Sequence, residues 1–356
     1  MVGKRALLLL LVLSFLFTPL FSAVVPVVDM SLLGNLNYKP STETFQQGMV
    51  MDLKISLPSP NSGNVRGEVV LEATYPSAAA LTLDDIVHKA YLRARFPSFR
   101  LTAGKTRLSW GDGMLFNAGD VLYGSASTSV NLMQATLRET TGWMASLNYP
   151  LGFFSFAEAI LIPSTTTRVE DAGFGLRFYT NVGETKVEAG YATTDSSGRT
   201  HKPYVSLQGN IGPDWYLSSS VTLDQELSAS SSDFLVTGGL FHSLYFSGDR
   251  TMTLRLEFLS RPLESWAFKS QEDATCTLLL YPEVVYTPSS TLSLSMRTIL
   301  SPLDFSGQAT LGASWSVFEG FSLVGYLSAP FGQSSDLFNW EGIQTISMNI
   351  GASWIY

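Results

Sequence analysis

ISMNIGASWIY (346–356) ends the chain with a regular alternation of side-chain character. Successive side chains of an extended strand point to opposite faces, so residues two apart share a face. One face of this segment is polar or small and carries Ser347, Asn349 and Ser353. The other face consists of Ile346, Met348, Ile350, Ala352, Trp354 and Tyr356. The segment is therefore predicted to be a strand between water and an apolar medium.

The same period of two returns in other parts of the chain. Apolar residues take alternate positions in three further segments: Met49, Met51, Leu53 and Ile55; Met252, Leu254, Leu256 and Phe258; Leu292, Leu294 and Met296. The residues between them include Arg255, Glu257, Ser293 and Ser295, which suit a wet face. A soluble sandwich alternates in the same way with its apolar face inward, so the period alone does not choose between water and lipid.

The amino-acid composition favours a strand face that contacts lipid over one that packs in a soluble core. Hydrophobic residues make up 45% of the chain, yet after Pro26 no uninterrupted apolar run approaches the length of a membrane helix. Only 15% of the residues are charged, whereas about a quarter is usual for a soluble domain. The outer surface is therefore not expected to face water alone.

The charge balance is acidic, with 22 basic and 30 acidic residues and a formal net charge of -8. Removing Lys4 and Arg5 with the first 23 residues leaves 20 basic against 30 acidic residues, a net charge of -10. Nucleic acid is not an expected partner of so acidic a chain. The single cysteine, Cys276, forms no intramolecular disulfide, and a chain of this length does not need one.

The first 23 residues predict a secretory signal peptide. Lys4 and Arg5 precede a long apolar run, and small residues end the segment at Ser22 and Ala23. The apolar run is shorter than the roughly 20 residues of a spanning helix, which disfavours an uncleaved anchor. No cysteine stands at the cleavage region, so no N-terminal lipid is expected. Residues 24–356 are assigned to one exported domain.

The connections between predicted strands alternate in length. Short turns at one end and long loops at the other are typical of a transmembrane β-barrel. Tight turns are predicted at 149–152, 181–184, 211–214, 246–249, 286–290 and 318–320. Longer polar loops are predicted at 163–170, 194–202, 224–232, 260–274, 301–306 and 329–343.

This spacing predicts an all-β fold, a transmembrane antiparallel β-barrel of about 18 strands, an even number as termini at one end require. Strands that lead to the long loops are expected to start near Val27, Arg66, Phe99, Phe153, Glu184, Asp214, Asp249, Thr291 and Phe321. Returning strands are expected to start near Phe45, Ile86, Thr136, Asp171, Pro203, Asp233, Thr275, Gly307 and Gln344. The stretch 130–147 contains RETTG, which has the composition of a turn. We treat it as part of one strand and keep 16 strands as the alternative.

The aromatic end of the chain resembles the C-terminal signal that the barrel-assembly machinery recognises in outer-membrane proteins. Trp354 and Tyr356 carry this resemblance. The final strand must close the barrel by pairing with the first, and aromatic side chains fit the interfacial girdle. The resemblance implies that the assembly machinery and outer-membrane lipid are partners of the chain.

The segment 83–96 allows two structures. A helix behind Thr82 fits a 3.6 period of apolar residues. A strand, which we favour, directs Ala90, Leu92, Ala94 and Phe96 toward lipid. The same strand directs Lys89, Tyr91, Arg93 and Arg95 toward the lumen, and Arg100 follows on the lumenal face of the next strand.

A compact motif extends from this strand to residue 120. It consists of A-Y-L, then a strand that ends in G-K-x-R-x-x-W-G, then G-x-x-F-N-x-x-D. The residues that carry it are Ala90, Tyr91, Leu92, Gly104, Lys105, Arg107, Trp110, Gly111, Gly113, Phe116, Asn117 and Asp120. This motif resembles one in a largely uncharacterised group of porin-like outer-membrane barrels of double-membraned bacteria. Ala118 stands where proline is usual, and His88 and Lys89 replace a more usual acidic residue. The resemblance implies the fold class and says little about substrate.

The longest connection, 109–135, begins beside the inward arginines. Folded into the lumen, it would narrow the pore and place Asp112 and Asp120 opposite Arg93, Arg95 and Arg100. Opposed charges across an opening select solutes by field and by size. A buried ion-pair network that rigidifies the barrel is the alternative interpretation. The candidate lumen residues are Lys89, Tyr91, Arg93, Arg95, Arg100, Arg107, Trp110, Asp112, Asn117 and Asp120.

Catalytic and cofactor chemistry fits this sequence poorly. A dinucleotide fingerprint needs a glycine where Phe116 stands and a helix after it. A calcium loop needs carboxylates at alternate positions, but mostly apolar residues separate Asp112 from Asp120. None of the three histidines has metal-ligand spacing; they are His88, His201 and His242. We expect no metal, no cofactor and no catalytic residue, and a hydrolase assembled from distant residues stays open.

The sequence predicts a bacterial outer-membrane channel for passive diffusion of small hydrophilic solutes, because a barrel of this size leaves an aqueous lumen unless loops fill it. Two other functions remain open. The long loops can instead bind a surface partner through exposed aromatic residues, namely Trp266, Phe268, Phe338 and Trp340. An exporter of polysaccharide or lipid is the other alternative, and it would need accessory partners. The solute and the oligomeric state do not follow from the sequence.

Overall fold

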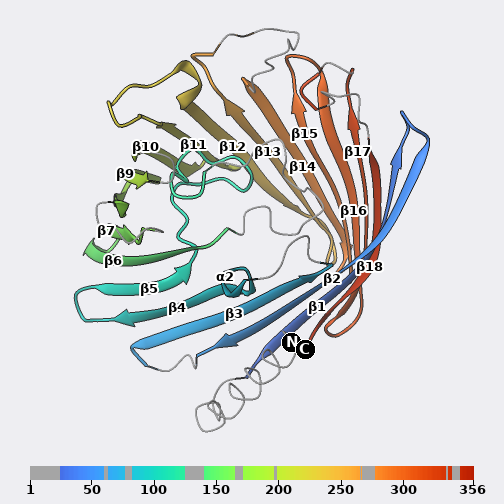
Figure 1. Ribbon diagram of the computed structural model, residues 1–356, viewed down its shortest axis with the longest axis horizontal. Coiled ribbons are helices and arrows are strands. Elements are labelled where there is room, and N and C mark those ends of the chain that lie inside the picture. Colours follow the sequence, from blue (N-terminus) through green and yellow to red (C-terminus); the bar gives the residue numbers. More distant parts are fainter. Residues whose placement is uncertain are drawn as a thin grey trace.

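The computed structural model describes residues 25–59, 63–76, 82–124, 140–164, 171–195, 199–264, 266, 277–333, 336–338 and 345–356. These residues form one antiparallel sheet of 18 strands (Figure 1). The strands are β1 (Val27–Lys39), β2 (Thr44–Pro58), β3 (Val65–Tyr75), β4 (Val87–Arg95), β5 (Arg100–Thr106), β6 (Gly142–Gly152), β7 (Ser155–Ile162), β8 (Gly173–Val182), β9 (Thr185–Asp195), β10 (Arg199–Asn210), β11 (Asp214–Val221), β12 (Phe234–Tyr245), β13 (Thr251–Ser260), β14 (Leu278–Ser289), β15 (Leu292–Ser301), β16 (Ser306–Phe318), β17 (Phe321–Phe331) and β18 (Ile346–Ile355). Short helical turns are α2 (Leu83–Ile86) and η2 (Ser231–Asp233).

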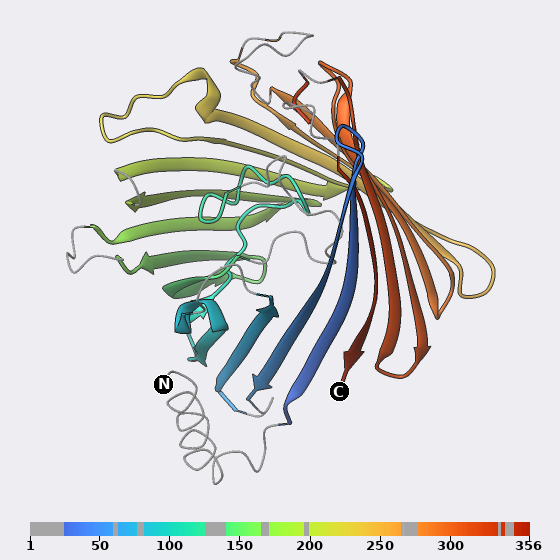
Figure 2. The same ribbon diagram turned by 45° about the vertical axis from the view of Figure 1, so that its right-hand side comes forward.

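The sheet closes into a barrel. Each strand pairs with its neighbours in sequence, and β18 pairs with β1 from Asp29 opposite Ile355 to Tyr38 opposite Ile346. At the seam the N–H of Tyr356 donates to the carbonyl oxygen of Val28 at 2.8 Å, and the N–H of Val28 returns the bond at 2.8 Å. Figures 1 and 2 show the last strand lying beside the first. The predicted barrel of 18 strands is confirmed, and the alternative of 16 is wrong.

The strand positions agree with the sequence prediction to within a few residues. The largest difference is at β6, which was expected near Thr136 and begins at Gly142. Residues 125–139 lie outside the described part of the chain, so Thr136 itself has no described structure. The prediction that 130–147 is one strand falls largely outside the described residues, which resume at Thr140. Thr140 and Thr141 of RETTG precede β6 and are not part of it.

Side-chain exposure confirms the alternation between the two faces. On β13 the outward Leu256 is 46% exposed, whereas the next residue, Glu257, is 1% exposed. On β18 the outward Met348 and Ile350 are 42% and 57% exposed. The outside of the ring is therefore an apolar belt, and the polar positions of the same strands face the lumen.

The apolar belt makes a direct prediction for a charged substitution. Met296 lies halfway along β15, and it is 51% exposed on the outer face. We expect Met296→Arg to lower the free energy of unfolding by about 2–4 kcal/mol, which arginine costs near the bilayer midplane. Ser295→Arg, on the lumenal face, is the matched control and should change the free energy of unfolding by less than about 1 kcal/mol. Unfolding from lipid vesicles measures both, and equal losses would refute the assignment of faces.

The two ends of the barrel differ in their connections. The start of β1, the end of β18 and the tight connections share one end, which we call the turn end. The longest connections are at the opposite end, the loop end, and join β5 to β6, β13 to β14 and β17 to β18. The predicted asymmetry between short and long connections is therefore confirmed.

Two connections at the loop end are shorter than the sequence predicted. At 194–202 the hairpin continues, because Thr194 and Thr200 are cross-strand partners and their hydroxyl oxygens lie 3.1 Å apart. At 301–306 the chain turns between β15 and β16, where Ser301 and Ser306 are cross-strand partners. Polar side chains in strand pairs have the same composition as loop residues, which explains both errors.

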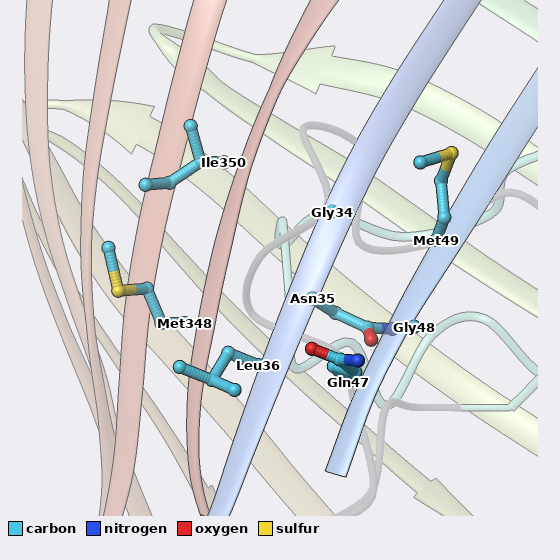
Figure 3. Close-up of a pocket in the computed structure, with 8 residues that line it drawn as sticks. All are labelled: Gly34, Asn35, Leu36, Gln47, Gly48, Met49, Met348 and Ile350. Atoms are coloured by element: carbon cyan, nitrogen blue, oxygen red, sulfur yellow. The ribbon is translucent and has the colours of Figure 1, made fainter. Parts of the chain in front are cut away.

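A hollow marks the outer face of the closing seam. Gly34 on β1 lies between Ile350 of β18 and Met49 of β2, and it has no side chain to fill the space. The hollow has a volume of about 670 Å³ (Figure 3). Its lining also includes Asn35, Leu36, Gln47, Gly48 and Met348. Because its apolar side chains belong to the outward belt, we assign the hollow to the outer surface of the barrel.

The helix considered behind Thr82 is present but short. Thr82 caps α2 by accepting the N–H of Asp85 at 3.3 Å, and the Asp85 carboxylate accepts the N–H of Thr82 at 2.9 Å. From Val87 onward the chain is strand β4, paired with β3 and β5. The longer helix is therefore wrong, because the ladder to two neighbours satisfies the backbone from that point.

Among the residues that the structure describes, there is no helix that is both long enough and apolar enough to cross a bilayer. The predicted signal peptide (1–23), Cys276, Phe268 and Trp340 lie outside the described residues.

Candidate functional site

Residues 107–124 leave β5 at the loop end and fold back into the barrel; we call them the inner loop. In Figures 1 and 2 this teal segment lies inside the ring of strands, close to β10 and β11. Its side chains are deeply enclosed, since Trp110, Leu115 and Phe116 are 0% exposed. The described part of the long connection therefore lies inside the lumen, as the sequence analysis considered.

The inner loop is fixed at its base by its own polar residues. Arg107 donates from Nη2 to Oδ2 of Asp120 at 2.5 Å, and the Asp120 side chain is fully buried. The hydroxyl of Tyr123 donates to the carbonyl oxygen of Thr106 at 2.9 Å, and the Arg107 guanidinium stacks over the Tyr123 ring. Burial lowers the pKa of Arg107 and raises the pKa of Tyr123 to about 12.

Asn117 and two glycines of the motif shape the turn of the loop. Asn117 donates from Nδ2 to the carbonyl oxygen of Trp110 at 2.9 Å. Gly111 has a φ of 66°, and a Cβ on it would lie 2.6 Å from Oδ1 of Asn117. Gly113 has a φ of 129°, and a Cβ there would lie 2.1 Å from the carbonyl oxygen of Phe116. Side chains other than hydrogen are therefore excluded at these positions.

The first anchor holds the start of the loop against β7, β9 and β10. Trp110 donates from Nε1 to Oε2 of Glu158 at 3.1 Å, and its ring stacks on Tyr204. The N–H of Gly111 donates to Oε1 of Glu188 at 2.6 Å, and the Tyr204 hydroxyl donates to the same oxygen at 2.5 Å. Wall side chains thus supply the acceptors that a loop without β-partners needs.

The second anchor holds the middle of the loop against β11, β12 and β13. Glu257 accepts three consecutive backbone N–H groups, from Met114 at 2.8 Å and from Leu115 and Phe116 at 2.9 Å each. Ala118 donates its N–H to Oγ1 of Thr237 at 2.8 Å. In the other direction, the Tyr216 hydroxyl donates to the carbonyl oxygen of Phe116 at 2.9 Å.

Apolar packing reinforces the second anchor. Leu115 and Phe116 pack on the lumenal wall, and the Phe116 ring meets Tyr281 edge to face at 6.5 Å. The remaining fully enclosed members of this cluster are Leu259, Leu279 and Ile299. The lumenal wall of β13 to β15 therefore carries apolar side chains beside Glu257 where the loop covers it.

Two ion-pair ladders line the lumen beside the anchors. Glu158 and Arg177 are cross-strand partners with Oε2 and Nη2 2.6 Å apart, and Arg177 also reaches Glu188 at 3.3 Å. In the second ladder, Glu283 lies between two arginines, 2.6 Å from Arg255 and 2.8 Å from Arg297. Arg255 also contacts Sδ of Met114 in the loop. The lumen therefore contains buried ion pairs, and they are made by residues other than the arginines and aspartates for which the sequence analysis considered a buried network.

The basic residues predicted on β4 and β5 form a separate surface, which we call the arginine wall (Arg93, Arg95 and Arg100). Arg95 and Arg100 are direct cross-strand partners, and Arg93 lies opposite Arg66 of β3. Arg93 and Arg95 are exposed although their strand positions face the lumen, and Arg100 is half-buried. Like charges opposite one another repel, so this arrangement is tolerated only where water reaches it. Tyr91 and Lys89 continue the same face of β4.

The acidic residues of the loop do not oppose the arginine wall as the sequence analysis expected. Asp120 forms an ion pair with Arg107 within the loop. Asp112 is half-buried, and burial together with the nearby Glu188 carboxylate raises its pKa. The carboxylates near the loop are therefore engaged or enclosed, and the exposed charge of β4 and β5 is positive.

Lys105 of the motif links β5 to α2 at the loop end of the barrel. It donates from Nζ to Oδ1 of Asp84 in α2 at 3.0 Å, and Trp143 donates from Nε1 to the same oxygen at 3.1 Å. Both hydrogen bonds lower the pKa of Asp84, that from Trp143 most. The motif residue is therefore a structural tie between α2 and β5.

The described residues 336–338 of a second loop lie beside the inner loop. Leu337 and Phe338 pack against the apolar cluster of the second anchor. Leu337 donates its N–H to Oδ2 of Asp304 at 2.8 Å, and Ser306 binds Oδ1 of the same residue. These bonds outweigh burial and lower the pKa of Asp304. Phe338 therefore faces inward, contrary to the exposed position that partner binding would need, whereas Trp266 is 46% exposed.

Sequence reasoning missed most of the residues that hold the loop. Glu158, Arg177, Glu188, Thr237 and Glu283 carry no local motif. One signal was available, because charged residues at lumenal positions of adjacent predicted strands are candidates for cross-strand pairs. Glu158 with Arg177 and Arg255 with Glu283 are such pairs. Their bonds to the loop could not be predicted, because they join segments far apart in the chain.

The histidines are dispersed in the structure, as their spacing suggested. His88 lies 3.3 Å from Glu72, and His201 contacts the Tyr191 hydroxyl. Within the described ranges, no group of three or more histidine, cysteine, aspartate or glutamate residues could hold a metal ion.

Comparisons with known proteins give a fold likeness and no sequence family. No protein-family model matches the chain, and no curated protein sequence matches it. Among solved structures, OccK11 (OpdR) of Pseudomonas aeruginosa is similar with a TM-score of 0.56 and 8% identity, over 93% of this chain and 95% of that one. The outer membrane protein opdK from Pseudomonas aeruginosa has a TM-score of 0.55 and 11% identity, over 93% and 98%. A mutant of the Rh. blastica porin has a TM-score of 0.50 and 9% identity, over 93% and 100%. These likenesses show that the chain has the porin-like barrel fold.

Proposed function

We propose that the protein is an outer-membrane channel through which small hydrophilic solutes diffuse passively, with a preference for anions. One observation carries the proposal: the inner loop is fastened to β7 and to β9–β13, while Arg93 and Arg95 of the arginine wall, on the nearby strand β4, stay exposed. A closed barrel of this strand number encloses a lumen wide enough for an aqueous path. The loop narrows that path, and the exposed charge beside it is positive.

The outer apolar belt and the unequal ends support the membrane placement. In barrels of this kind the short turns face the periplasm and the long loops face outward. The turn end is therefore assigned to the periplasm. A cleaved signal peptide at residues 1–23 and recognition of Trp354 and Tyr356 by the barrel-assembly machinery complete the proposed route of the chain to the outer membrane.

The preference for anions follows from the burial of four lumenal carboxylates. Glu158, Glu188, Glu257 and Glu283 are 3%, 8%, 1% and 3% exposed, so arginines or loop N–H groups neutralise them. Arg93 and Arg95 remain exposed. A field of one sign in a narrow low-dielectric opening raises the local concentration of the opposite ion.

The charge preference has a direct test. Replacing Arg93, Arg95 and Arg100 together by glutamine should lower the ratio of anion to cation permeability by roughly threefold at low salt and less at high salt. The reversal potential under a KCl gradient measures this ratio. Arg250→Gln, on an exposed turn, is the control for a lost positive charge. A triple variant that matches Arg250→Gln would remove the assigned role of the arginine wall.

Passive diffusion itself is tested by swelling of proteoliposomes. Vesicles that contain the folded protein should swell in small sugars and more slowly in larger ones, because a fixed loop sets the free cross-section. Empty vesicles are the reference. Equal swelling of protein-containing and empty vesicles with every solute would overturn the proposal.

A further inference from the structure

The apex of the inner loop presents consecutive backbone donors to a single side chain. Glu257 accepts hydrogen bonds from the N–H groups of Met114, Leu115 and Phe116. Oε1 accepts the bond from Met114, and Oε2 accepts the other two. Successive N–H groups that converge in this way form an anion-binding concavity. The occupant of the concavity is a carboxylate of the barrel wall, 1% exposed, on a strand more than a hundred residues further along the chain.

We infer that Glu257 is the positioning residue of the constriction, and that it sets the size limit for solutes by holding the loop apex against β13. This inference rests on the proposed channel function. Glu257 accepts three bonds from N–H groups of the loop, whereas Glu188 and Thr237 of the described wall accept one each. Bonds from N–H groups to an ionised acceptor are among the strongest available to a loop.

The residues around Glu257 determine which groups lose a partner when its carboxylate is replaced. The Arg255 Nε atom lies 3.7 Å from Glu257, and Arg255 has a second carboxylate partner in Glu283. Loss of the Glu257 charge therefore leaves Arg255 paired. The three loop N–H groups, in contrast, would face an amide or an empty site. In Glu257→Gln the side-chain amide directs its own donors at one or two of these N–H groups in either orientation.

The effect on the loop is measured by thiol protection. Ala118 is 3% exposed, so a thiol introduced there is enclosed while the apex is held. In a Cys276→Ser background, Ala118→Cys should react slowly with a membrane-impermeant maleimide. Adding Glu257→Gln should raise that rate at least about tenfold, because local opening becomes more frequent when buried donors lose a charged acceptor. Adding Glu257→Asp, which keeps an acceptor-only carboxylate, should give a smaller increase.

Glu283→Gln is the matched control. Glu283 is similarly buried and lies on the next strand, but it bonds to residues of the wall: Arg255, Arg297 and Tyr281. The inference requires that this variant leave the introduced thiol protected. Equal reactivity after either glutamine substitution would mean that loss of any buried carboxylate loosens the lumen, and would overturn the assignment to Glu257.

Solute size provides a second readout. Glu257→Gln should admit larger uncharged polymers in conductance-block measurements and keep the anion preference, since the arginine wall is unaltered. Heat-modifiable migration in gel electrophoresis verifies that the barrel is folded. If Glu257→Gln does not fold, Thr237→Val removes the neighbouring anchor bond and should raise the reactivity of the introduced thiol above that of the control.

The two proposals fail in different ways. A wild-type protein that passes no current would refute the channel but not the role of Glu257 in holding the loop. A conducting wild type, with the introduced thiol equally protected in all variants, would refute the role of Glu257 alone.

Discussion

Replacing residues 107–141 by a short glycine-serine turn should raise the single-channel conductance by roughly twofold or more, since a barrel of this size is wide once no loop obstructs it. The substitution is geometrically simple, because Thr106 and Gly142 are cross-strand partners at the ends of the removed segment. A hairpin turn can therefore join β5 to β6 without displacing either strand. The upper size limit for sugars in swelling assays should rise in parallel.

The matched control shortens a different connection. Replacing residues 222–233, which join β11 to β12, removes a shorter polar segment at the loop end while the inner loop keeps its anchors. Its conductance should remain close to that of the unmodified protein. If removal of the inner loop leaves conductance at the control value, the loop does not form the constriction, whatever its position in the lumen.

The largest expected loss of stability follows from Arg177. Its guanidinium pairs with Glu158 and Glu188 and lies over the rings of Trp110 and Phe156. Its side chain is 11% exposed, and those of the two glutamates are 2% and 10% exposed. Arg177→Met would leave both carboxylates beside the first anchor without this cation. We expect the free energy of unfolding to fall by about 3–5 kcal/mol, the usual cost of breaking a buried pair from one side.

Guanidinium titration of the protein in lipid vesicles measures this loss. Arg250→Met is the control, because Arg250 is exposed on a turn and bonds to Ser247 nearby. A surface substitution of this kind should change stability by no more than about 0.5 kcal/mol. Similar values for both variants would show that water, and not Arg177, satisfies Glu158 and Glu188. The ladder would then have no structural role.

The barrel was predictable because lipid and water impose a period of two on every strand. The segment 49–55 and the C-terminal strand show that period except at Val50 and Ile355, and Met49, Met51, Met348 and Ile350 are exposed on the outer face. The prediction failed where side chains of strands and loops are alike. Thr194 and Thr200 looked like loop residues and are paired in a hairpin.

The inner loop was predictable in part. Its length, its glycines and its place after a strand with inward arginines indicated a segment that enters the lumen. The partner of Asp120 was predicted wrongly, since Asp120 lies within reach of Arg107 once the loop turns at Asn117. The residues on either side of Asn117 bond to β12 and β13. The hydrogen bond between Phe116 and Glu257 cannot be predicted from local sequence, because the two residues come together only in the closed barrel.

The open lumen is tested most directly by the current through a planar lipid bilayer after addition of the purified, folded protein. We predict discrete steps of steady current, proportional to voltage, with a reversal potential in a salt gradient that favours anions. The loop is bound to the wall at two anchors, so the steps should show little spontaneous closing at low voltage. Protein that is inserted and folded, as heat-modifiable migration shows, and yet produces no steps would contradict the central claim that the lumen is an open path.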